Sequence, residues 1–132
     1  MIEPIWVKES VVIAIHSRQL AEHGGIDGIR DKGLLESALF RPKNKFFYEN
    51  PSIFELAAAY GCGIKKNHPF IDGNKKTSYV VTRTFIKLNG YDIQASETEK
   101  YDIWIGVASN QINEDELSAW IENISVFTAD RG

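Results

Sequence analysis

The stretch that decides the fold of this 132-residue sequence is HPFIDGNKKT, residues 68–77. It brings a histidine, an aspartate, a glycine and two lysines together between two segments, 52–64 and 73–88, that are rich in apolar residues. Their apolar residues recur at helical spacing, and both segments are apolar enough to lie in a core. We therefore predict that residues 68–72 form a loop between two buried helices, the second of which begins near residue 73.

The residue types in this stretch suit the chemistry of phosphate groups. The start of a helix offers unpaired backbone N–H groups and a partial positive charge, and Gly73 lets the backbone approach an anion closely. Lys75 and Lys76 add charge, and Asp72 supplies the hard oxygen ligand that Mg²⁺ takes when it bridges nucleotide phosphates. His68 can remove a hydroxyl proton near neutral pH. The stretch therefore predicts a nucleotide-dependent transferase, although it is not a P-loop.

Apolar periodicity predicts about six helices in all, and capping residues mark several of their starts: Asp31, Ser52 with Glu55, Ser96 with Glu99, and Asn113 with Glu116. The predicted ranges are residues 10–23, 31–41, 52–64, 73–88, 96–107 and 113–124. Pro42 is expected to end the second helix, because proline disfavours helical geometry in the residue before it, and residues 43–50 are expected to be irregular. The β-branched residues within 73–88 leave a strand there as the alternative.

Length and composition predict one globular domain. Hydrophobic residues make up 43% and charged residues 25%, close to the globular average. The single cysteine, Cys62, is expected to be a buried, reduced thiol, and no apolar run approaches the roughly 20 residues needed to span a bilayer. With no export signal, we expect a cytoplasmic protein. The net charge of -3 argues against direct binding of nucleic acid.

The sequence resembles the Fic/Doc superfamily, whose loop motif H-x-F-x-D/E-G/A-N-x-R/K is matched by residues 68–76. The similarity extends from about Val11 through residues 24–39, GGIDGIRDKGLLESAL, to the last predicted helix. It implies an all-α fold, a compact bundle of about six helices in a single domain over residues 1–132. The resemblance also allows a short β-hairpin flap near residues 45–49, which would bind the backbone of a target protein.

The residues after the motif asparagine resemble the death-on-curing (Doc) branch. AMP-transferring Fic enzymes usually have a glycine there, followed by an arginine and by a second arginine three residues on. This sequence has Lys75, Lys76 and Tyr79 at those places. The resemblance implies a nucleotide bound the opposite way round, so that the γ-phosphate is transferred and the protein is a kinase.

The resemblance also implies a role for each residue of the motif. His68 would be the catalytic base, Asp72 the catalytic carboxylate linked to Mg²⁺, and Phe70 an anchor in the core. The nucleotide- and phosphate-binding residues would be Gly73, Asn74, Lys75, Lys76 and, as a further basic contact, Lys66. A solvated helix end is the alternative for Lys66. Lys76 replaces the arginine common in Doc proteins, and it cannot form a bidentate contact, which points to weaker or altered catalysis.

The implied cofactors are ATP and Mg²⁺, and the implied partners are two proteins. Doc toxins phosphorylate a threonine of elongation factor Tu and so arrest translation. They are held by an antitoxin of the prevent-host-death type, whose disordered tail folds into a groove as a helix. We therefore expect this chain to be the toxin of a toxin–antitoxin pair.

Two other functions stay open. Pro69 and Gly73 are more typical of Fic than of Doc proteins, which favours an AMP transferase. The replacement at Lys76 also leaves room for a catalytically silent binding module. The segment SAWIEN, residues 118–123, resembles the inhibitory helix of some Fic proteins, an idea that we give little weight because so short a pattern arises easily.

Other residues of the sequence are expected to be structural. His16 and His23 are expected to be ordinary helix residues at the surface. Trp104 and Trp120 lie at core spacing, and packing is the expected role of both.

Overall fold

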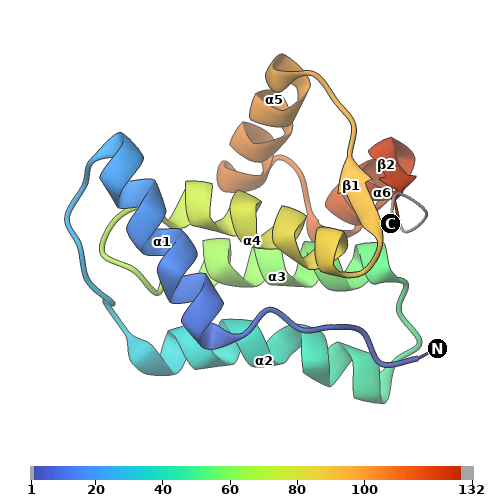
Figure 1. Ribbon diagram of the computed structural model, residues 1–132, viewed down its shortest axis with the longest axis horizontal. Helices are drawn as coiled ribbons and strands as arrows, with labels where there is room; N and C mark the ends of the chain where they lie inside the picture. The colour runs from blue at the N-terminus through green and yellow to red at the C-terminus, as the bar shows by residue number, and fades with distance from the viewer. Residues whose placement is uncertain (1, 129–132) are drawn as a thin grey trace.

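The computed structural model describes residues 2–128, in which six α-helices and two short strands follow one another (Figure 1). Their bounds are α1 Glu9–His23, α2 Lys32–Tyr48, α3 Ile53–Asn67, α4 Asn74–Leu88, β1 Tyr91–Ile93, α5 Glu97–Ala108, α6 Glu114–Ile124 and β2 Ser125–Phe127. The predicted all-α bundle of about six helices is confirmed. Within the described part of the chain, no helix is long and apolar enough to cross a membrane.

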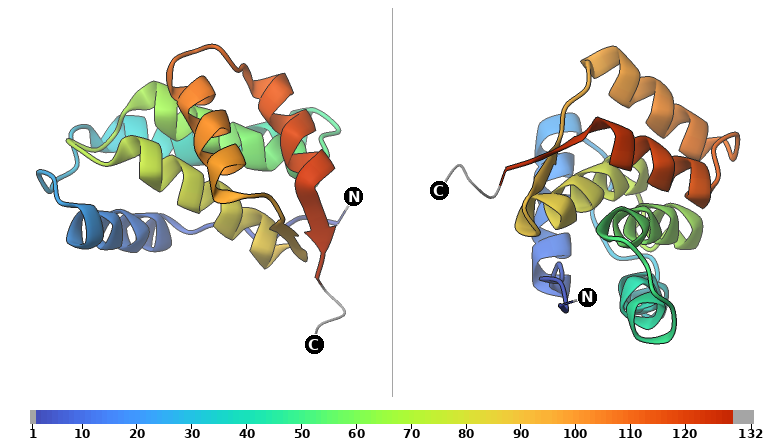
Figure 2. Two further views of the ribbon diagram at one scale, coloured as in Figure 1. Left: turned by 90° about the horizontal axis from the view of Figure 1, so that it is seen from above. Right: turned by 90° about the vertical axis from the view of Figure 1, so that its right-hand side faces the viewer.

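Helix α3 is the centre of the bundle. It packs against α2, α4 and α6, and the three views in Figures 1 and 2 show these helices around it. The predicted capping box starts the helix, with the side chains of Ser52 and Glu55 each bonded to the other's backbone N–H. Every residue from Leu56 to Tyr60 has no exposed surface. A helix that is apolar on nearly every face is stable only when other helices cover it, which is what the sequence predicted for this segment.

Helix α4 lies beside α3, and the alternative of a strand over residues 73–88 is wrong. The contact is close because Gly61 of α3 has no side chain, and a Cβ there would lie 2.6 Å from Oγ1 of Thr82. The Ser78 hydroxyl donates to the Gly61 carbonyl at 2.8 Å, and the Thr82 hydroxyl donates to the Ser78 carbonyl at 2.8 Å. The hydroxyls of Ser78 and Thr82 are thus satisfied at the α3–α4 contact, whereas the buried hydroxyls of Thr77 and Tyr79 have no hydrogen-bond partner among residues 2–128.

Helix α2 continues through Pro42 to Tyr48, so the predicted stop at Pro42 and the irregular segment 43–50 are wrong. Proline has no N–H to donate to the carbonyl four residues earlier, that of Ala38. That carbonyl lies at the contact with α3, 3.3 Å from where a Cβ of Gly63 would be. Pro42 itself is buried, and packing against α3 outweighs the lost hydrogen bond. Residues 45–49 consequently form the end of a helix and its cap, and the short antiparallel pair of strands that accompanies the bundle is formed by β1 and β2.

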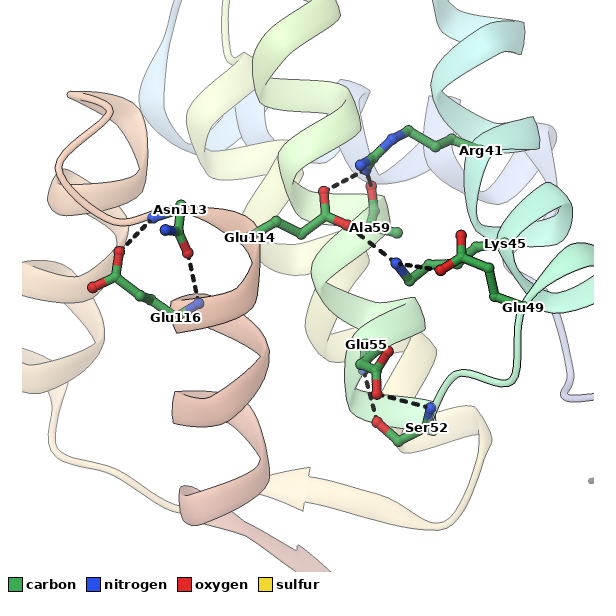
Figure 3. Close-up of polar contacts among 9 residues, drawn as sticks. All are labelled: Arg41, Lys45, Glu49, Ser52, Glu55, Ala59, Asn113, Glu114 and Glu116. Atoms are coloured by element: carbon green, nitrogen blue, oxygen red, sulfur yellow. Dashed lines mark hydrogen bonds and ion pairs between the residues drawn. The ribbon is translucent and has the colours of Figure 1, made fainter.

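A polar network joins α2 to α3 and α6 (Figure 3). Arg41 pairs with Glu114 at 2.5 Å and donates to the Ala59 carbonyl at 3.3 Å. Lys45 lies 4.0 Å from the same glutamate and 3.5 Å from Glu49. These contacts fix the start of α6 against the two helices that precede the motif loop.

The two strands close the bundle at the end of α4. They pair antiparallel, with Asp92 opposite Val126, and are joined through α5 and α6. Arg83 of α4 donates to both carboxylate oxygens of Asp92, at 2.9 and 3.2 Å. This bond holds the pKa of the Asp92 carboxyl below its ordinary value and raises the pKa of Arg83. The pair therefore ties β1 to α4 as an ionised contact at neutral pH.

Substituting Gly61→Ala is expected to lower the free energy of unfolding by about 1–3 kcal/mol, because the new methyl group must displace Thr82 in a packed contact. Urea unfolding followed by circular dichroism measures the change. Gly33→Ala is the matched control, since its Cβ meets only the Asp31 side chain at 3.4 Å near an exposed helix start. Equal midpoints for the two variants would contradict the close α3–α4 contact.

Candidate active site

The motif loop, residues 68–73, joins α3 to α4 and has a left-handed residue at each end. His68 has φ 51 and ψ 54, and Gly73 has φ 82 and ψ 13. Residues 28–31 lie alongside the loop and pair with it through backbone hydrogen bonds, as neighbouring strands of a sheet do. The Ile71 N–H donates to the Gly28 carbonyl at 3.0 Å, and the Arg30 N–H donates to the Pro69 carbonyl at 2.7 Å. The loop is therefore ordered by a segment that is distant in the sequence.

Arg30 holds the end of α3 and the backbone of His68. Its Nε donates to the His68 carbonyl at 2.7 Å, and its Nη2 donates to the Asn67 carbonyl at 2.9 Å. Carbonyls at a helix C-terminus carry partial negative charge, so a guanidinium stabilises them. The side chain of His68 stays exposed. No local pattern in the sequence points to Arg30, because its partners are backbone groups of a distant segment.

Phe70 and Asn74 fix the middle of the loop. Phe70 has no exposed surface, which confirms it as the core anchor. The Asn74 amide accepts from the Phe70 N–H at 3.0 Å and donates to the Phe70 carbonyl at 2.8 Å. Asn74 is only 4% exposed, and its side-chain amide is already hydrogen-bonded to the Phe70 backbone within the loop. What Asn74 can offer a phosphate in this conformation is its backbone N–H.

His16 was expected at the surface, and that expectation is wrong. The side chain is 2% exposed, and its ring stacks on Phe70 with centroids 3.8 Å apart and an interplanar angle of 8°. Its Nε2 lies 2.8 Å from the carbonyl oxygen of Asp72. The available signal was its position on α1, one turn after the buried Val12. His23, by contrast, is exposed, as expected.

The carboxylate of Asp72 faces the turn after α1. Its Oδ2 accepts from the Ile26 N–H at 2.7 Å. A Cβ on Gly25 would lie 3.2 Å from the Asp72 Cβ, so a glycine at that position lets the turn approach. Within residues 2–128, Oδ1 of Asp72 accepts no hydrogen bond, which leaves a fixed, hard oxygen at the loop.

Two neighbouring cavities lie at the start of α4. The motif cavity, about 510 Å³, is lined by Gln19, Leu20, His23, Gly24, Gly25, His68, Ile71, Asp72, Gly73, Asn74, Lys75 and Lys76. The aromatic cavity, about 420 Å³, is lined by Gln19, Glu22, His23, Lys75, Lys76, Tyr79, Val80, Glu97, Lys100, Tyr101 and Trp104. The structure thus brings every predicted site residue except Lys66 to the motif cavity, and both cavities share the two lysines.

The start of α4 is positively charged and rich in backbone donors. The Thr77 N–H is bonded to the Gly73 carbonyl at 3.0 Å, so the preceding N–H groups come before the first intrahelical bond. No acidic residue occupies the first turn of α4. Lys75 Nζ lies 6.0 Å from the ring centroid of Tyr101. These features favour an anion at the boundary between the two cavities.

Trp104 forms a wall of the aromatic cavity and is also part of the core, as predicted. It is 5% exposed, its Nε1 donates to the Ser78 hydroxyl at 3.3 Å, and its ring meets Tyr79 edge-on at 4.9 Å. Trp120 packs edge-on against it at 6.4 Å. The cavity therefore has one well-packed aromatic wall, Trp104, on the side of α5.

Two other residues named from the sequence lie away from this chemistry. Burial raises the pKa of the Cys62 thiol to about 11, so the thiol is protonated at neutral pH and is a poor nucleophile. Glu122 of the segment SAWIEN is exposed on α6 and lines neither cavity. Its helix leads into β2, which pairs with the strand that follows the far end of α4.

Residues 6–86 match the Fic/DOC family over more than half of the chain. The chain belongs to this family. It is 30% identical over 103 residues to the protein kinase doc of Escherichia phage P1, covering 77% of this chain and 81% of the relative. It is 31% identical over 104 residues to the toxin Doc of Mycolicibacterium smegmatis, covering 73% and 77%. These two similarities place the chain in the Doc branch.

Solved structures support the fold alone. The N-terminal Fic domain of a putative cell filamentation protein from Bartonella quintana matches with a TM-score of 0.52 and 19% identity, over 76% of this chain and 48% of that one. The same domain with bound ADP matches with a TM-score of 0.50 and 19% identity, over 75% and 49%. The chain therefore spans about half the length of these solved chains.

Removing the guanidinium in Arg30→Ala is expected to reduce the transferase activity of the family at least tenfold, because His68 loses the contact that fixes its backbone. Arg18→Ala is the control, since Arg18 is exposed on α1 and pairs with Glu22 only as a surface ion pair. Turnover and thermal unfolding are measured for both variants. Equal turnover would show that Arg30 does not position His68.

Proposed function

We propose that this protein is a Doc-type toxin that transfers the γ-phosphate of ATP to a hydroxyl of a target protein. The observation that carries the proposal is the position of the aromatic cavity relative to His68. His68 lines the motif cavity and not the aromatic cavity, and Lys75 and Lys76 lie at the boundary between them. A nucleotide that fills both cavities would cross this boundary with its phosphates.

The two cavities differ in the part of a nucleotide that they suit. The aromatic cavity offers Tyr79, Tyr101 and Trp104, on which a base can stack. The motif cavity offers the charged start of α4 and the carboxylate of Asp72, which suit phosphates. With the base on the aromatic side, the phosphate farthest from the base lies nearest His68. That phosphate is the γ-phosphate, which favours a kinase over an AMP transferase.

The chemistry assigned to the residues is then a direct phosphoryl transfer. His68 takes the proton of the target hydroxyl, whose oxygen forms a bond to the γ-phosphorus. The bond from that phosphorus to the β–γ bridging oxygen breaks, and ADP leaves. Lys75, Lys76 and the first N–H groups of α4 hold the phosphates and offset the charge on the transferred group.

Asp72 fits the role of the protein ligand to Mg²⁺. Proteins usually bind this ion through one or two carboxylates together with substrate phosphates and water. Among residues 2–128 there is no cluster of three or more His, Cys, Asp or Glu side chains, and Asp72 has one oxygen free of hydrogen bonds. When bound, Mg²⁺ supplies positive charge that neutralises the phosphates. Lys66 lies outside both cavities, so we place it at a solvated helix end rather than on the nucleotide.

The relatives support the same activity and suggest the partners. One relative is a protein kinase, one is a toxin, and the Bartonella domain was solved with ADP. We extend to this chain ATP and Mg²⁺ as cofactors, elongation factor Tu as the target and an antitoxin of the prevent-host-death type as the inhibitor. A separate antitoxin is consistent with the placement of Glu122 outside both cavities.

Incubating the protein with elongation factor Tu, ATP and Mg²⁺ is expected to add the mass of one phosphate to the factor, with label arriving from γ-labelled ATP. The His68→Ala variant should add nothing, because it has no base to take the hydroxyl proton. Intact-mass spectrometry measures both results. Addition of AMP would show an AMP transferase, whereas an unmodified factor together with toxicity that survives His68→Ala would show a silent binding module.

Tyr101→Ala is expected to raise the KM for ATP roughly tenfold, since stacking on an aromatic ring contributes about 1–3 kcal/mol per base. Tyr101 is 65% exposed, so its loss should leave the thermal unfolding temperature nearly unchanged. Ile105→Ala is the control, because Ile105 lies one turn later on α5 and lines neither cavity. An unchanged KM in Tyr101→Ala would place the base elsewhere and remove the argument for γ-phosphate transfer.

A further inference from the structure

His16 is a buried histidine to which the proposed chemistry gives no role. Its Nε2 lies 2.8 Å from the carbonyl oxygen of Asp72, near the end of the motif loop that leads into α4. A carbonyl oxygen can only accept a hydrogen bond, so Nε2 of His16 carries the proton and donates it. The side chain is 2% exposed, and this bond satisfies its buried ring nitrogen.

The ring of His16 also lies against Phe70, two residues before Asp72, and against Gly73, the residue after it. It stacks on Phe70 at a centroid distance of 3.8 Å. A Cβ added to Gly73 would lie 3.6 Å from Cδ2 and 3.7 Å from Nε2 of His16. The imidazole is thus fixed by packing on both sides, and its N–H has a set direction.

The hydrogen bond fixes the orientation of the peptide between Asp72 and Gly73. In a trans peptide the carbonyl and the following N–H point in opposite directions, and the described residues contain no cis peptide bond. Because the Asp72 carbonyl points to His16, the Gly73 N–H points away from it. There it precedes the N–H groups of Asn74 and Lys75, which come before the first intrahelical bond of α4.

We propose that His16 is a positioning residue that keeps this peptide turned so that the Gly73 N–H, and not the Asp72 carbonyl, contributes to the anion site. With the peptide rotated the other way, a carbonyl oxygen would repel the phosphates that the start of α4 attracts. His16 touches no substrate and acts through the loop. The proposal rests on the proposed function for the identity of the anion, a nucleotide phosphate.

Two substitutions separate the hydrogen bond from the packing. His16→Phe keeps an aromatic ring against Phe70 and removes the donor. His16→Gln removes the ring and keeps an amide N–H at about the reach of Nε2. Val12→Ala is the structural control, because Val12 is fully buried one turn earlier on α1 and lies outside the motif cavity.

The first measurement is the affinity of each variant for ATP with Mg²⁺, by calorimetry. His16→Phe is expected to bind about tenfold more weakly, since a lost hydrogen bond of ordinary strength corresponds to about that factor. His16→Gln is expected to bind within about threefold of the wild type, and Val12→Ala likewise, despite a lower unfolding temperature. A loss of affinity that follows the unfolding temperature across all three variants would overturn the proposal.

The second measurement needs no nucleotide. In the wild type, NMR is expected to show a protonated Nε2 of His16 and a carbonyl shift of Asp72 typical of a hydrogen-bonded group, which His16→Phe loses and His16→Gln restores. An unprotonated Nε2 in the wild type would overturn the proposal even if His16→Phe did not fold. If the wild type does not bind ATP, the proposed function fails, and the Asp72 signal alone decides whether His16 holds the peptide.

Discussion

The pair of hydrogen bonds between the Asn74 amide and the backbone of Phe70 is the constraint on which the site depends. A loop that enters a core must satisfy its own N–H and carbonyl groups, and one buried amide does so for Phe70 at 3.0 and 2.8 Å. The Phe70 ring can then lie in the core without a strand or helix around it. His68 and Asp72, on either side of this anchor, keep a defined backbone while their side chains reach the motif cavity.

Hydrogen bonds fix the backbone of His68 and Asp72, the two residues that we propose to be reactive, and the side chain of His68 stays exposed. Arg30 donates to the carbonyl of His68, and His16 donates to the carbonyl of Asp72. The chain carries a net charge of -3, yet the first turn of α4 has two lysines and no acidic residue. A local field of this kind attracts an anion whatever the sign of the whole molecule, because charges beyond about 10 Å are largely screened.

The features that the sequence predicted correctly depend on neighbouring residues. Asp31, Ser52 and Asn113 cap their helices through N–H groups a few residues away, so a local pattern is sufficient. Pro42 could not be judged locally, because its place inside α2 depends on burial and on the absence of a side chain at Gly63. His16 was misplaced although it lies one turn after the buried Val12, because its hydrogen-bond partner, the Asp72 carbonyl, is distant in the sequence.

Similarly, the motif predicted which residues gather at the site but not what holds them there. Every predicted residue except Lys66 lines the motif cavity. The contacts of Arg30 with His68 and of His16 with Asp72 join residues 38 and 56 positions apart. A pattern within one segment contains no information about partners at that distance, and the aromatic cavity, built from three helices, was missed for the same reason.

These long separations have a consequence for the time at which the protein becomes reactive. During synthesis, His16 and Arg30, whose side chains bind the motif loop, leave the ribosome before α3 and the start of α4. A nascent chain that ends soon after the motif already contains His68 and Asp72, but α4 has not yet packed against α1 and α3. Long-range contacts form late because they must first close the intervening loop. The geometry of the site should therefore arise in one late step of folding, so that a chain ending soon after the motif lacks an ordered site.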